Sequence, residues 1–148
     1  MKWNEVSTQD EIDHLLDIFG GFHDACVREA HLTTKHWVNQ NLSMHCTPDL
    51  DTNISFIVHR QFRNPSCIEM KFDSIVHINW SPSPENYDSS IYDAEIAFEN
   101  SEIYWVINTA GSPSGLDPKT NCWVVAKSLK WRVADEFLGN ELHYTTKL

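Results

Sequence analysis

The sequence predicts an α+β fold, with one N-terminal helix packed on a curved, mainly antiparallel β-sheet of six to eight strands. Apolar residues recur with helical spacing near the N-terminus, and after Gly21 the apolar period changes from 3.6 to 2. Short polar turns join the period-two segments, as in antiparallel hairpins. No repeat or linker divides the 148 residues, so we expect a single domain 1–148 with the helix at about 8–19 and the β-rich body at about 25–135.

The helix is expected between a capping residue and a pair of glycines. Thr8 and Glu11 have the spacing of a capping box. Gly20 and Gly21 end the segment, because glycine adopts the left-handed conformation of a helix C-terminus without steric cost. The apolar stripe that would cover the sheet consists of Ile12, Leu15, Leu16 and Phe19.

The β-rich body is expected to contain two unusually long strands. In the first, alternate residues from Ile68 to Trp80 are apolar, with Ser74 as the interruption. Trp80, Trp123 and Trp131 share the predicted core parity of their strands. Asn100-Ser101 suggests a tight hairpin. Strands are expected at about 26–34, 37–38, 42–46, 54–62, 67–80, 92–99, 103–107 and 123–133, with one helical turn at 136–138.

The charge balance narrows the classes of partner. Eleven basic residues stand against 21 acidic ones, for a formal net charge of −10. Binding to nucleic acid or to an anionic membrane surface depends on clustered Lys and Arg, so neither is expected, whereas the charge allows a basic protein or a metal cation as the partner. The alternative is that the excess acid only keeps the protein soluble. No apolar run is long enough for a transmembrane helix, and the N-terminus lacks the pattern of a signal peptide. We therefore expect a cytoplasmic protein.

Neither the cysteines nor the histidines form a recognisable metal motif. Cys26, Cys46, Cys67 and Cys122 are widely spaced, which favours unpaired thiols that pack as small apolar groups. Eight histidines are present, but none has the short spacing of a zinc motif. No metal and no cofactor are expected.

The segment Phe22-His23-Asp24 is the most distinctive local candidate for a site. Histidine titrates near neutral pH, and a carboxylate can orient its ring. His59 and His77 lie on separate predicted strands and could converge with His23 or Asp93. The alternative is structural, with Asp24 capping backbone amides in a turn and His23 filling a niche.

A second candidate site is an acidic face of the sheet. If the two strands that carry these residues are neighbours, their polar sides bring like charges together, which a basic partner would relieve. The alternative is a solvated face that basic residues on the sheet neutralise. The candidate residues are Glu69 and Asp73 on one strand, and Asp93, Glu95 and Glu99 on or beside the other.

Several segments together resemble a group of small, uncharacterised bacterial proteins with a G-F-H-D segment after a short N-terminal helix. The segments are Trp3 with the acidic helix, Gly20 to Cys26, Arg60 to Pro65, Pro82 to Asp88, and Leu129 to Arg132. This resemblance implies no particular activity or catalytic residue. In outline, a helix followed by a strand-rich acidic body is also similar to bacterial toxin-immunity proteins, a similarity of architecture rather than of motif.

Three hypotheses about function follow. We favour a non-catalytic protein-binding module, of the immunity type, whose acidic sheet face occludes a basic partner. The alternative is a small hydrolase or ligand-binding protein with a site around His23 and Asp24. A third is a homodimer that forms through an open edge of the sheet.

Overall fold

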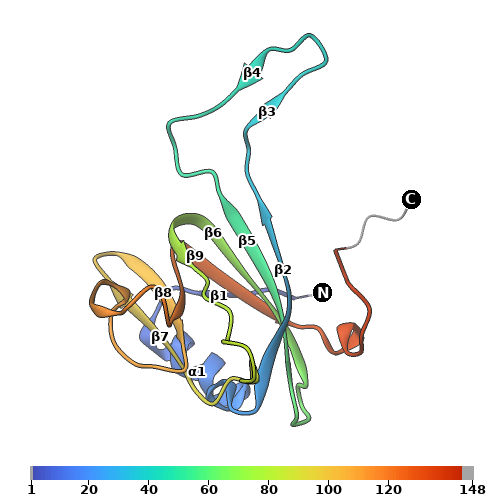
Figure 1. Cartoon of the computed structure of the whole chain (residues 1–148), viewed down its shortest axis with the longest axis vertical. Coiled ribbons are helices and arrows are strands. Elements are labelled where there is room, and N and C mark those ends of the chain that lie inside the picture. The colour runs from blue at the N-terminus through green and yellow to red at the C-terminus, as the bar shows by residue number, and fades with distance from the viewer. Residues whose placement is uncertain (1, 145–148) are drawn as a thin grey trace.

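The computed structural model describes residues 2–144 and confirms the α+β class (Figure 1). Within these residues there are one α-helix, a seven-stranded antiparallel sheet and a separate two-stranded sheet. None of the described helices is long and apolar enough to cross a membrane. The elements are β1 (Asn4–Val6), α1 (Gln9–Ile18), β2 (Ala25–Thr33), β3 (Trp37–Val38), β4 (Met44–His45), β5 (Asn53–Arg60), β6 (Cys67–Asn79), β7 (Ala94–Glu99), β8 (Glu102–Ile107) and β9 (Cys122–Val133), with short 3₁₀ turns at Gly20–Phe22, Pro113–Gly115 and Asp135–Phe137.

The long strands β6 and β9 pair along the middle of the main sheet. The strand order is β2-β5-β6-β9-β8-β7, and every pairing described in this sheet is antiparallel. Two strands, β8 and β1, share the edge of β9 that does not face β6. Its first half pairs with β8, and its second half pairs with β1, which the period-two pattern did not indicate.

Helix α1 forms between the residues that the sequence indicates. The Thr8 side chain accepts a hydrogen bond from the Glu11 backbone N–H, at 3.2 Å, and so satisfies one of the free amides at the helix start. Ile12, Leu15 and Phe19 are completely buried in the core cluster that includes the sheet residues. The apolar stripe therefore covers one end of the sheet.

Aromatic rings fill the centre of the core. The indole of Trp105 is fully buried, and its ring centroid lies 5.1 Å from that of Phe56 and 6.0 Å from that of Phe72. Phe22, which follows the helix, reaches the same cluster at 5.5 Å from Trp105 and 5.2 Å from Phe19. The helix is thus anchored to the sheet through aromatic contacts.

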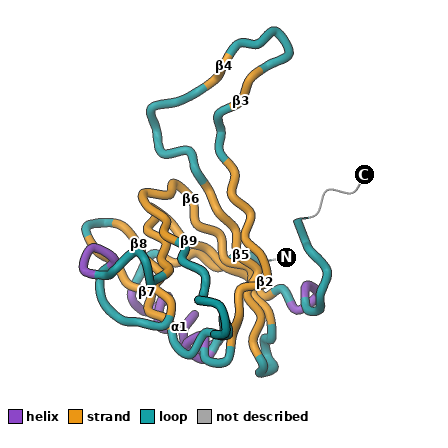
Figure 2. Tube along the Cα trace, in the orientation of Figure 1, coloured by secondary structure: helices purple, strands orange, loops and turns teal. Residues whose placement is uncertain are grey.

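The small sheet of β3 and β4 forms an arm that projects from the body (Figures 1 and 2). Strands β2 and β5 lead into and out of it. Trp37 stacks on His45 with ring centroids 4.1 Å apart, while Leu42 and Met44 are 83% and 73% exposed. The arm has no core of its own, and a two-stranded ribbon is at most marginally stable alone.

The regular alternation expected along β6 and β9 is wrong near Ser74, and on β6 a register shift between Ile75 and His77 restores the expected face for Ile78. Ser74 has a φ of +56°, and the core residues on either side of it, Phe72 and Ile75, are three positions apart. On β9 the core residues change register in the same way, so that Trp123 faces away from the core and joins a second apolar cluster. Trp80, also expected in the core, is 41% exposed.

We expect Phe22→Ala to lower the free energy of unfolding by about 3–5 kcal/mol, because it removes a fully buried ring between α1 and the sheet. Urea unfolding followed by circular dichroism measures this change. Leu42→Ala, on the exposed arm, is the matched control and should stay within about 0.5 kcal/mol of the original chain. Equal effects would show that Phe22 does not anchor the helix.

Candidate functional site

The segment Gly20–Asp24 makes a tight corner between α1 and β2. Gly20, Gly21, Phe22 and Asp24 all have left-handed φ values, between +54° and +66°. Gly20 is favoured by its left-handed φ of +59°, whereas the nearest atom to a Cβ there, Arg60 Nη1 at 2.9 Å, is the end of a flexible side chain that can shift. The corner turns the Phe22 ring into the core and leaves the His23 ring outside.

His23 is held at the surface by its neighbours. Its Nδ1 lies 3.0 Å from the Tyr92 carbonyl oxygen, and since a carbonyl only accepts, Nδ1 carries the proton of that hydrogen bond. Its Nε2 lies 3.4 Å from Asp24 Oδ2, and the two side chains are 57% and 42% exposed. Neither residue lines the two cavities described below. This geometry fastens the corner to the start of β7.

The histidines proposed to converge with His23 lie elsewhere. His59 Nε2 is 2.9 Å from the Phe137 carbonyl oxygen, next to the C-terminal segment. His77 Nδ1 accepts a hydrogen bond of 2.8 Å from Trp123 Nε1. Within residues 2–144, no group of three or more His, Cys, Asp or Glu side chains is placed to hold a metal ion.

The proposed acidic face is not continuous in the structure. Its two strands, β6 and β7, are not neighbours, because β9 and β8 lie between them. Glu69 is only 6% exposed and accepts a 2.7 Å hydrogen bond from Arg132, so it does not belong to any exposed surface. Asp73 lies 4.0 Å from Lys71, and Asp93 accepts a hydrogen bond from the Ala94 backbone N–H.

The carboxylates of β7 instead hold a loop over the sheet. Glu95 accepts hydrogen bonds of 2.8 Å from both the Tyr104 hydroxyl and the Gly111 backbone N–H. Glu99 accepts one of 2.5 Å from the Ser112 hydroxyl. The loop between β8 and β9 is thereby fixed above the apolar cluster that contains Tyr104 and Trp123.

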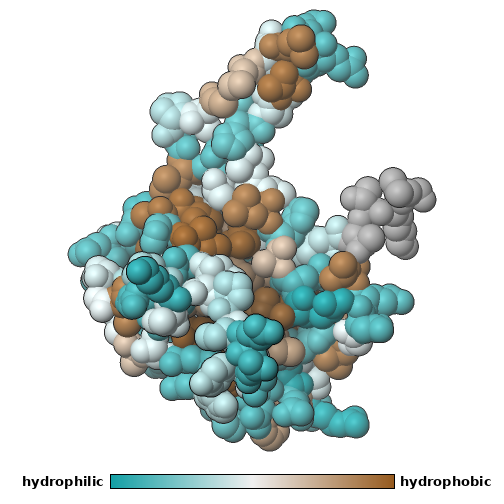
Figure 3. All heavy atoms as spheres, in the orientation of Figure 1, coloured by the Kyte–Doolittle hydropathy of each residue, from teal (hydrophilic) through white to brown (hydrophobic). Residues whose placement is uncertain are grey.

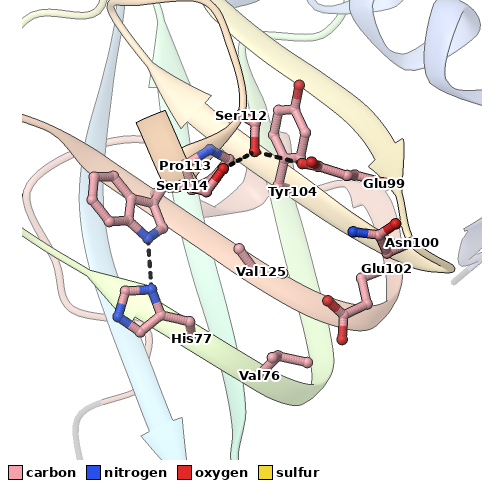
Figure 4. A pocket seen from close by; sticks show the side chains of 11 residues that line it. Val76, His77, Glu99, Asn100, Glu102, Tyr104, Ser112, Pro113, Ser114 and Val125 are labelled. Carbon is pink, nitrogen blue, oxygen red and sulfur yellow. Dashed lines mark hydrogen bonds between the residues drawn. The ribbon is translucent and has the colours of Figure 1, made fainter. Parts of the chain in front are cut away.

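Beside this loop lies a concavity of about 350 Å³, which we call the outer recess (Figure 4). Its floor is apolar and aromatic. Its rim carries the carboxylates of Glu99 and Glu102 and the hydroxyls of Ser112 and Ser114. Of the sequence-predicted site residues, His77 and Glu99 meet here. The lining residues are Val76, His77, Glu99, Asn100, Glu102, Tyr104, Ser112, Pro113, Ser114, Trp123 and Val125.

The outer recess is electrostatically negative. The described residues that line it include two carboxylates and neither Lys nor Arg. Glu102 is partly neutralised by Lys127, whose Nζ lies 3.0 Å away, whereas Glu99 is bonded only by the neutral Ser112 hydroxyl among the described contacts. Burial, together with the hydrogen bond to Glu95, raises the pKa of Tyr104 to about 12, so its hydroxyl stays neutral at pH 7.

The imidazole of His77 has a defined tautomer. An indole N–H can only donate, so His77 Nδ1 must be free of a proton, and the neutral ring carries its hydrogen on Nε2. In this form Nε2 is a donor and does not accept a proton from a hydroxyl. The Ser112 hydroxyl lies between Glu99 and Ser114 in Figure 4, while the drawn bond of His77 goes to Trp123.

Sequence reasoning missed Glu102, Ser112 and Trp123 as members of one site. For Glu102 a signal was present, because the hairpin expected at Asn100-Ser101 places Glu99 directly opposite it, as the register confirms. For Ser112 and Trp123 no local pattern exists, since a loop and a strand far along the chain bring them to the recess.

Comparison with models of known protein families, with curated proteins and with solved structures finds no match to this chain.

We expect Tyr104→Phe to reduce the loss of stability at alkaline pH. The folded-state pKa of Tyr104, about 12, lies above the ordinary value of 10, so its contribution is intact below pH 10 and lost as the pH rises to 12. The variant loses the bond to Glu95, about 1 kcal/mol at pH 7, but its stability should fall less steeply between pH 10 and 12. Urea unfolding across this range measures both slopes, and parallel slopes would contradict the assignment.

We expect Glu69→Leu to lower the free energy of unfolding by about 3 kcal/mol, because it leaves the buried Arg132 guanidinium without its closest carboxylate. Glu136, the remaining partner of Arg132, is largely exposed. The double variant Glu69→Leu/Arg132→Met should recover at least half of that loss, since no buried charge is then left unpaired. Thermal and urea unfolding of the two variants test this, and a double variant less stable than the single one would show that the pair itself is strongly stabilising.

Proposed function

We propose that this protein is a non-catalytic binding module for a basic protein, and that the outer recess receives a Lys or Arg side chain of that partner. The observation that carries the proposal is the pairing of Glu99 and Glu102 on the rim of an apolar concavity whose described lining contains no basic residue. An inhibitor of the immunity type, which covers a basic toxin, is the form of this function that we favour.

The shape of the recess suits a long basic side chain. Such side chains bury an apolar stem and keep the charged head near water or a carboxylate. Val76 and Val125 supply an apolar surface for the stem, and the faces of aromatic rings attract cations. The carboxylates on the rim lie where the head would emerge, so stem and head both find complementary surroundings.

The charge of the whole chain supports the same class of partner. A net charge of −10 attracts a basic protein over a distance of about one Debye length and accelerates encounter more than it tightens binding. Hydrogen bonds from Ser112 and Gly111 hold the β7 carboxylates and the loop in place before a partner arrives. Little conformational entropy should therefore be lost on binding.

The arm favours a protein rather than a small cation as the partner. Its exposed Trp37 and Met44 are side chains of the kinds enriched in the centres of protein interfaces, and Leu42 adds exposed apolar surface beside them. Figure 3 shows hydrophobic residues at the end of the arm, away from the body. A protein can contact both the arm and the recess, whereas a free amine or guanidine fits only the recess.

The test is an NMR titration of the ¹⁵N-labelled protein with Nα-acetyl-arginine amide, with Nα-acetyl-norleucine amide as the uncharged control. We expect the Trp123 indole N–H and the Val125 amide to shift with the arginine compound only, and the affinity to fall with added salt. Glu99→Gln/Glu102→Gln should weaken binding by about 3- to 30-fold, from two partly exposed ion pairs.

The matched control removes the same net charge from another part of the surface. Asp10→Asn/Asp17→Asn changes two exposed acids on α1 and should leave the titration of Trp123 almost unchanged. If both double variants weaken binding equally, the net charge of the chain and not the recess is responsible, and the proposal is wrong.

A further inference from the structure

A second and larger concavity, of about 570 Å³, opens on the other face of the sheet. We call it the inner cavity. His77 lines the outer recess and its neighbour Ile78 lines the inner cavity, so the two hollows lie on opposite sides of β6. The inner cavity is bounded by β2, β5 and β6, by the segment that follows β6, and by residues before and at the start of β9. Its volume is within the range of small-molecule sites, about 300–1,000 Å³.

The floor of the inner cavity is aromatic and incompletely covered. Phe56 is fully buried and stacks on Trp80 with ring centroids 5.4 Å apart and an angle of 28° between planes. Trp80 nevertheless remains 41% exposed. Ile54, Ile78 and Ile107 add apolar walls. In Figure 3, hydrophobic residues gather on the body near the foot of the arm. A flat apolar molecule would cover this surface.

Two buried donors around this floor have no hydrogen-bond partner among the described residues. One is Nε1 of Trp105, which is fully buried beneath the floor and does not line the cavity itself, although its ring packs near those of Phe56 and Trp80. The other is Nε of Arg28, a residue that lines the cavity. A buried donor left unpaired costs about 1–3 kcal/mol. Most such groups in proteins are satisfied. Of these two donors only that of Arg28 belongs to a residue of the lining, so only Arg28 bears on the choice of ligand.

The charge of the inner cavity is opposite to that of the chain. Its described lining includes Arg28 and Lys119, neither of which forms an ion pair within residues 2–144. The one carboxylate in the lining, Glu29, is occupied by the backbone N–H groups of His143 and Tyr144. Arg28 donates a hydrogen bond of 2.5 Å to the Asn140 backbone carbonyl oxygen, so Lys119 is the cation of this lining that is least engaged. In a chain of net charge −10, a cavity whose cations have no carboxylate partner favours an anionic group.

We infer that the inner cavity is a binding site for a small aromatic anion, with the aromatic part against Trp80 and the anionic group toward Lys119 and Arg28. This site is separate from the outer recess and does not depend on the function proposed for it. A neutral apolar molecule would satisfy the floor but not the cations, and a simple anion would satisfy the cations but not the floor. The combination selects a molecule that carries both groups.

The experiment compares two fluorescent probes of similar shape, 1-anilinonaphthalene-8-sulfonate, an aromatic anion, and N-phenyl-1-naphthylamine, which lacks the sulfonate. We expect the anion to bind at one saturable site and more tightly than the neutral probe. Lys119→Gln should weaken binding of the anionic probe by about 3- to 5-fold and leave the affinity for the neutral probe unchanged, because only the anion interacts with that charge. Trp80→Ala should weaken binding of both probes by about tenfold or more.

Two controls separate this site from other apolar surfaces. Trp37→Ala, on the arm, should change neither probe, and Glu99→Gln/Glu102→Gln, in the outer recess, should not reduce the affinity of either. Near-ultraviolet circular dichroism verifies that each variant is folded. Lys119 is exposed, so Lys119→Gln remains informative even if Trp80→Ala does not fold. The inference is overturned if the anion does not saturate, if Lys119→Gln affects both probes or neither, or if Trp37→Ala abolishes binding.

Discussion

The pairing of β6 with β9 is the constraint on which the rest of the structure depends. These are the two longest strands, and every other strand of the main sheet pairs with one of them directly or through one intervening strand. Both change the face that they present to the core at the same level of the sheet, near Ser74 on β6 and between Ala126 and Leu129 on β9. The pairing of the two strands continues past this level with a register shift between Ile75 and His77, while the apolar residues divide between two faces.

That division gives the molecule two apolar surfaces instead of one. On the inner side, Trp105 packs against Phe56 and against Phe22 after α1, and an opening remains beside Trp80. On the outer side, Trp123 and Tyr104 would be exposed if the loop between β8 and β9 did not cover part of them. The outer hollow is rimmed by carboxylates and the inner one by cations, so the two faces of one sheet favour ligands of opposite charge.

Local patterns predicted the elements well because each depends on neighbours in the chain. The Thr8 cap, the stripe from Ile12 to Phe19 and the hairpin at Asn100-Ser101 all form as expected. The errors begin where one residue changes the phase of a strand. A left-handed φ at Ser74 places Ile75 in the core and Val76 on the outer side. A register shift between Ile75 and His77 then returns Ile78 to the inner side, and nothing in a period-two pattern marks either change. The burial of Glu69 was missed for a related reason, since its partner Arg132 is 63 residues away.

The sequence by itself determined the fold class, the helix and its buried face, the positions of most strands, and a charge that favours basic partners. Only the tertiary structure decided which strands are neighbours and which side chains share a hollow. The physical reason is that helix periodicity and turns are local, whereas sheet pairing joins residues that are distant in the chain. His77 and Trp123 are 46 positions apart and meet through a hydrogen bond, and no pattern along the chain encodes that contact.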